Sequence, residues 1–140
     1  MKHFIDTQFD LAILIALEEM GEPISKERIV HKTKSFWQRW KKHSQKQEVT
    51  RIRGRLSDLT TKGIILCRKE NGREYYYLNR DYKPKDIIGK CMGELFQYVP
   101  ISFWSDEVLF DYEEVKGNSL IFTLQEIREI VLKYDISEYV

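Results

Sequence analysis

The segment KGIILCRKENGREYYYL, residues 62–78, contains the feature that most restricts the fold, the dipeptide Asn71-Gly72 between two stretches rich in β-forming residues. A two-residue type I′ turn needs positive φ at both central residues, and Asn-Gly is its strongest sequence signal. Such a turn fixes the hairpin register, with Glu70 opposite Arg73 beside the tip. Alternation along the strands then predicts one core-facing set, which consists of Ile65, Cys67, Tyr76 and Leu78.

The first strongly helical segment precedes this hairpin. Residues 9–17 are apolar apart from Asp10, which is too much for a single stripe, so we expect this helix to be covered on two sides. Asp6 or Thr7 is a suitable N-cap, and Gly21 suits the left-handed stop of the helix.

Two more helices are expected before the hairpin. Ser25 is a good N-cap for a short one. The next is expected at residues 50–62, with Thr50 as its cap and Gly63 at its end. Arg55 lies near the buried stripe of that helix, where it can snorkel toward solvent. The stripe follows the spacing i, i+4 and i+7 and consists of Ile52, Leu56 and Leu59.

A family resemblance rests on the pattern L-x-x-L-x-x-x-G-I-I, followed by a hairpin with a polar tip. The pattern is formed by Leu56, Leu59, Gly63, Ile64 and Ile65. It resembles the winged helix-turn-helix DNA-binding family over residues 4–82. The resemblance implies an α+β fold, in which three helices and a two-stranded β-hairpin, the wing, form a domain over residues 1–83. Residues 33–48 exceed the few residues that usually join the second and third helices, so they are expected to be an insertion.

Residues 84–140 are expected to form a mainly helical C-terminal extension that packs on the first helix. A helix is predicted within residues 86–99, a short extended piece at residues 119–122, and a last helix whose capping box is Thr123 and Glu126. The apolar and aromatic content of the extension favours a homodimer, with an ordinary monomeric core as the alternative. The aromatic residues concerned are Phe96, Tyr98, Phe103, Trp104, Phe110 and Tyr112.

Charge is divided unevenly along a chain whose formal net charge is +1. Residues 1–85 contain 19 Lys or Arg against 11 Asp or Glu, whereas residues 86–140 contain 4 against 11. Within residues 31–55 the balance is nine against one. A run of one sign repels itself unless a partner neutralises it, and phosphates would do so. The distribution therefore favours a nucleic acid as partner of the first half.

The candidate DNA-binding residues lie on the predicted third helix, in the basic insertion and on the wing. Small and hydroxyl residues opposite the buried stripe allow close approach to a groove, and arginines can form forked contacts with guanine or phosphate. At the wing, the alternative is a polar tip that only prevents edge-to-edge pairing. The residues are Thr50, Arg51, Arg53, Gly54, Ser57 and Thr61 on the helix, Lys41 and Lys42 in the insertion, and Arg68, Lys69, Asn71 and Arg73 on the wing.

Catalytic and metal chemistry has little support in the sequence. His3, His31 and His43 fall in no nucleophile, metal or phosphate-loop motif, so we expect neither an enzyme nor a cofactor. Cys67 and Cys91 have no metal-ligand spacing and are expected to be buried thiols. The apolar segments are too short to cross a bilayer, and no secretory signal is recognisable, which predicts a cytoplasmic protein with no membrane partner.

These patterns lead to one main hypothesis and two alternatives. The main one is a transcriptional regulator that binds double-stranded DNA as a homodimer, with the helix at residues 50–62 in the major groove and the wing on the backbone. The first alternative is a winged helix used as a protein–protein assembly module. The second, a replication or RNA-binding factor, shares the same electrostatic features.

Overall fold

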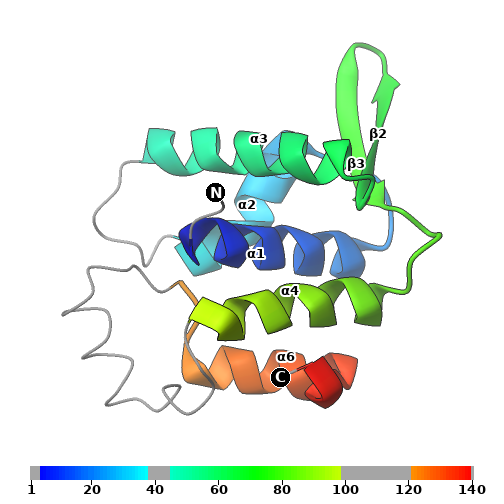
Figure 1. Cartoon of the computed structure of the whole chain (residues 1–140). Helices are drawn as coiled ribbons and strands as arrows, with labels where there is room; N and C mark the ends of the chain where they lie inside the picture. Colours follow the sequence, from blue (N-terminus) through cyan, green and yellow to red (C-terminus); the bar gives the residue numbers. More distant parts are fainter. Residues whose placement is uncertain (1–3, 38–44, 99–120, 140) are drawn as a thin grey trace.

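The computed structural model describes residues 4–37, 45–98 and 121–139, and Figure 1 shows the arrangement of its elements. In chain order they are α1 (Phe4–Met20), β1 (Ile24–Ser25), α2 (Lys26–Trp37), α3 (Gln45–Thr61), β2 (Ile65–Glu70), β3 (Arg73–Leu78), α4 (Pro84–Tyr98), α6 (Leu124–Tyr134) and the 3-10 turn η2 (Ser137–Tyr139). Across these residues, five α-helices accompany a three-stranded antiparallel sheet of order β1-β3-β2, which confirms the α+β class.

Helix α1 lies at the centre of the molecule, with α3 on one side, α4 on the other and α2 crossing behind it in the view of Figure 1. Every residue from 9 to 17 is buried, so the expectation of a helix covered on two sides is confirmed. The helix ends as expected before Gly21, whose φ is +68°.

The start of α1 differs from the predicted one. Asp6 and Thr7 are not caps, because the helix already includes Phe4 and both residues lie buried within its first turns. Phe4 is only 6% exposed, and its ring stacks on that of Tyr98 with centroids 5.6 Å apart. Burial of this ring accounts for the extra turn, because tertiary packing stabilises a helix more than its cap does.

The hairpin has the predicted turn and register. Asn71 and Gly72 have φ of 52° and 78°, as a type I′ turn requires, and all six pairs from Glu70 opposite Arg73 to Ile65 opposite Leu78 are formed. β1 adds a third strand beside β3. Asn79 reinforces the base of the hairpin, because its side-chain amide donates to the carbonyl of Gly63 at 2.8 Å.

One member of the predicted core-facing set is exposed. Ile65, Tyr76 and Leu78 are buried, but Cys67 is exposed, so its assignment to the core was wrong; Cys91 is buried, and both thiols are free. The hairpin rises beyond the helices (Figure 1), and Cys67 lies on the edge strand β2, where no helix covers it. The inward face of the hairpin is therefore buried only at its base and beside β1.

Helix α3 begins five residues before the predicted cap. Its first residue is Gln45, so Thr50 lies within the helix and does not cap it, while the expected end before Gly63 is correct, with φ of +75°. The residues before Thr50 are Gln-Lys-Gln-Glu-Val, mostly good helix formers, and they continue the helix backward. α2 also extends to Trp37, so much of the expected insertion is helical.

The C-terminal extension shares the core with the first three helices. Buried residues of α4 and α6, among them Ile88, Leu95 and Ile127, belong to the same hydrophobic cluster as those of α1. The capping box of α6 is confirmed, since Thr123 and Glu126 each accept the other's backbone N–H. Of the extended piece predicted at residues 119–122, residues 119 and 120 lie outside the described residues. Residues 121 and 122 are buried but form no strand; the backbone N–H of Ile121 donates to the Gln8 side chain at 2.7 Å.

Close packing of Tyr139 against α4 explains the glycine at position 89 of this helix. A β-carbon at this position would lie 2.4 Å from the ring of Tyr139, so its absence leaves room for the turn that follows α6. The hydroxyl of Tyr139 donates to Asp86 at 2.8 Å, which fastens that turn to the start of the same helix. The helix predicted here is confirmed, at a small cost in propensity that this close packing offsets.

Candidate nucleic-acid interface

The outward face of α3 is the exposed side of the helix opposite its buried stripe. Ile52, Leu56 and Leu59 are at most 3% exposed, which confirms the predicted stripe. Five of the six predicted outer residues are exposed, and the sixth, Arg51, is partly buried; the exposed ones are Thr50, Arg53, Gly54, Ser57 and Thr61. In Figure 1, α3 and the C-terminal helices α4 and α6 lie on opposite sides of α1. The C-terminal helices therefore leave this face open.

Gly54 occupies the middle of this face, where a glycine costs helix stability. A β-carbon built on it would meet no described atom within 4 Å. Close packing against another described helix therefore does not explain the glycine.

Replacing Gly54 with alanine is expected to raise the free energy of unfolding by about 0.5–1 kcal/mol, because alanine restricts the unfolded chain and favours the helix. Urea denaturation measures the change. Gly21→Ala is the matched control: its β-carbon also meets nothing within 4 Å, but φ is +68°, so that variant should lose about 1 kcal/mol. A loss of stability in Gly54→Ala would contradict the open position of this residue.

Two arginines of α3 are engaged by carboxylates of α1. Arg55 forms a forked contact with Asp10, with Nε 2.7 Å from Oδ1 and Nη2 2.9 Å from Oδ2, and also reaches Asp58 at 2.7 Å. Burial opposes the charge of Arg55, but its hydrogen bond to Asp10 and the nearby carboxylates raise its pKa above the ordinary value. Arg51 pairs with Asp6 through one contact, from Nη1 to Oδ1. These two charges hold α3 on α1 and are partly neutralised.

The spacing of these four residues is a signal that the prediction did not use. Asp6 and Asp10 are four residues apart on the largely buried helix α1, and Arg51 and Arg55 have the same spacing. Both pairs join positions 45 apart in the sequence, so the two helices run side by side in the same direction. Buried carboxylates require cationic partners, and a matching spacing shows where to look for them.

The tip of the hairpin presents the other predicted DNA-binding residues. Arg68, Lys69, Asn71 and Arg73 are all exposed. Arg68 lies 3.1 Å from Glu70, in a pair whose two side chains are about half exposed and which is therefore weak. Lys69 and Arg73 form no ion pair with any residue in the described ranges.

A groove joins this tip to the start of α2 and adds one cation that the prediction missed. Its volume is about 570 Å³, and its lining consists of Ser25, Lys26, Glu27, Lys69, Gly72, Arg73 and Glu74. Ser25 accepts the backbone N–H of Arg28 at 3.3 Å, as predicted for the cap of α2. The short strand β1 thereby brings Lys26 next to Lys69 and Arg73.

Other predicted features fall elsewhere or have no counterpart here. Lys41 and Lys42 lie outside the described residues, as do the aromatic residues Phe103, Trp104, Phe110 and Tyr112. Within residues 4–37, 45–98 and 121–139, no group of three or more His, Cys, Asp or Glu is placed to hold a metal ion. None of the helices that the structure describes has the length and apolar character to cross a membrane.

Comparison of the chain with protein-family models, with curated proteins and with solved structures finds no match. Its function therefore has to be inferred from its own residues.

Proposed function

We propose that this protein binds double-stranded DNA as a winged helix-turn-helix protein, with the outward face of α3 in the major groove and the β2–β3 hairpin on the backbone. The order of three helices followed by the β2–β3 hairpin supports this proposal, because it is the arrangement that the sequence resemblance implies. We further propose that it regulates transcription as a homodimer, which would place two such helices on successive turns of the duplex.

The open face of α3 is the observation that carries the proposal. A helix enters the major groove only if one of its faces is free of the protein and bears side chains that reach base edges or phosphates. Here Gly54 and three hydroxyl residues provide close approach, and Arg53 provides a donor that pairs with no described carboxylate. The hairpin projects beside the end of the same helix (Figure 1), so one duplex could contact both elements.

The ion pairs of α3 limit how many cations are available for phosphate. Arg51 and Arg55 already contact Asp6 and Asp10, so most phosphate contacts fall to Arg53 and to the cations of the hairpin. With Lys26 and the basic residues 39–46, about five contacts are a reasonable expectation. Each contact contributes about −0.9 to the slope of log K against log salt.

DNA binding is expected to weaken with salt with a slope of about −4 to −5, because about five phosphate contacts release counterions. Fluorescence anisotropy with a labelled random duplex between 50 and 300 mM salt measures it. The variant Arg73→Ala should reduce the slope by about 1 and weaken binding to all duplexes alike. Site selection from random duplexes should then recover a preferred sequence.

Other outcomes of this experiment favour the alternatives. Absence of binding at 50 mM salt would overturn the proposal and favour a protein–protein assembly module. Equal or tighter binding to an RNA duplex of the same length would favour the RNA-binding alternative, because A-form RNA does not admit a helix to its major groove. A mass measurement in solution tests the homodimer separately.

A further inference from the structure

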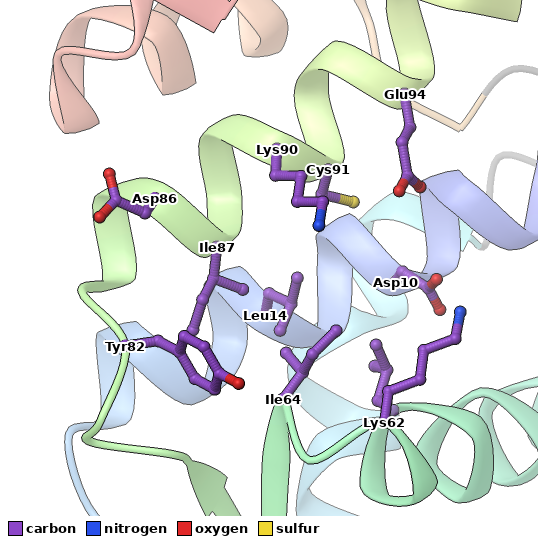
Figure 2. A pocket seen from close by; sticks show the side chains of 11 residues that line it. Asp10, Leu14, Lys62, Ile64, Tyr82, Asp86, Ile87, Lys90, Cys91 and Glu94 are labelled. Carbon is purple, nitrogen blue, oxygen red and sulfur yellow. The ribbon is translucent and has the colours of Figure 1, made fainter.

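A second groove lies between α1, the end of α3 and α4, away from the open face of α3 (Figure 2). Its volume is about 450 Å³, within the range of small-molecule sites. It is lined by Asp10, Leu14, Leu59, Lys62, Ile64, Tyr82, Asp86, Ile87, Lys90, Cys91 and Glu94. These residues come from α1, α3 and α4 and from the α3–β2 and β3–α4 connections, so the groove lies where these five segments meet.

The floor of the groove is apolar. Leu14, Leu59 and Ile87 are at most 9% exposed and belong to the hydrophobic core, and Ile64 packs against that core while remaining partly exposed. The ring of Tyr82 stands at one end of the groove, and this residue is 50% exposed. A ligand with a small apolar body could cover this ring and the floor.

Two lysines contribute positive charge to the groove, and one of them, Lys62, also pairs with Asp58. Figure 2 shows the amino groups of Lys62, which follows the end of α3, and of Lys90, on α4, turned into the space between the helices. Lys62 is positioned by Asp58, with Nζ 3.1 Å from Oδ2. Partial burial raises the pKa of Asp58, but Lys62 and Arg55 lower it more, so this carboxylate stays charged and holds Lys62 in place.

Two of the three carboxylates of the lining are held by other residues. Asp10 is held by the guanidinium of Arg55, and Asp86 points away from the groove and accepts the hydroxyl of Tyr139. Glu94 lies at the rim near α1. The centre of the groove therefore combines an apolar floor with two ammonium groups, a combination suited to an organic anion.

We propose that this groove binds a small carboxylic acid with an apolar body. Its carboxylate would contact the ammonium groups of Lys62 and Lys90, and its aliphatic or aromatic part would cover Leu14, Ile64 and Ile87 and stack against Tyr82. The site is separate from the face proposed for DNA, and its existence does not depend on DNA binding.

The test uses 3-phenylpropionate as a probe with the full chain, followed by amide and side-chain NMR shifts. We expect saturable shifts confined to residues 10–14, 59–64 and 82–94, and at least tenfold weaker binding of the neutral 3-phenylpropionamide, because the amide lacks the charge that the lysines recognise. Lys62→Met and Lys90→Met keep the apolar stem and remove the charge, so each should weaken binding of the acid about fivefold to tenfold.

Lys69→Met is the matched control, since this lysine is exposed on the hairpin and should leave binding of the acid unchanged. The lysines of the groove are also on the surface, so their variants should fold, and unchanged far-UV circular dichroism would verify it. The proposal is overturned if millimolar acid produces no saturable shift, if the amide binds as tightly as the acid, or if the shifts lie on the hairpin.

Discussion

Replacing Arg55 with methionine is expected to lower the free energy of unfolding by about 3–5 kcal/mol. The side chain of Asp10 is only 2% exposed, and both of its carboxylate oxygens accept from Arg55. Methionine keeps most of the apolar stem but leaves this carboxylate buried without its cation. Urea denaturation followed by circular dichroism measures the loss, which is large for a domain of 140 residues.

Two further variants separate the buried charge from other effects. Asp10→Leu combined with Arg55→Met removes both charges, so it should recover most of the loss, as apolar replacements of buried ion pairs do. Arg53→Met, two positions away on the exposed face, should change stability by no more than about 0.5 kcal/mol. A small loss in Arg55→Met alone would mean that water or another cation compensates Asp10, and that this pair does not anchor α3.

Local rules were sufficient to predict the hairpin and the helix ends marked by glycine. Asn71-Gly72 fixes the turn and hence the register, because both residues adopt positive φ at low cost. Gly21 and Gly63 mark the ends of α1 and α3 for the same reason. The buried stripe of α3 follows from helical periodicity alone. Each of these features depends on residues within a few positions of one another.

Features that depend on contacts far apart in the sequence were missed or misplaced. The start of α1 is set by stacking of Phe4 on Tyr98, and the exposure of Cys67 by how far the helices reach along the hairpin. Likewise, the partners of Arg51 and Arg55 lie 45 positions away on α1. The basic run was therefore predicted as one surface, although part of it is neutralised within the protein. Which cations remain available becomes clear only from the packing of α3 on α1.

Reversing two of the available cations, in the double variant Arg53→Glu/Arg73→Glu, is expected to weaken DNA binding by at least about 100-fold. Each contact to a base or phosphate is worth about 1–3 kcal/mol, and a carboxylate adds repulsion to the loss. Arg53 is exposed on α3 and Arg73 on the hairpin, so the variant tests both proposed contacts at once. Anisotropy at 100 mM salt measures the affinity, and each single variant shows how much its element contributes.

The matched control is Arg128→Glu combined with Lys133→Glu, which makes the same change of net charge on exposed residues of α6. Helix α6 lies on the far side of α1 and α4 from α3 (Figure 1), so this variant should lose little affinity beyond a general electrostatic effect. If both double variants weaken binding equally, DNA contacts no particular face, and the assignment of α3 and the hairpin fails. If only the first does, and its urea midpoint is unchanged, the loss arises from the interface itself, because the fold is intact.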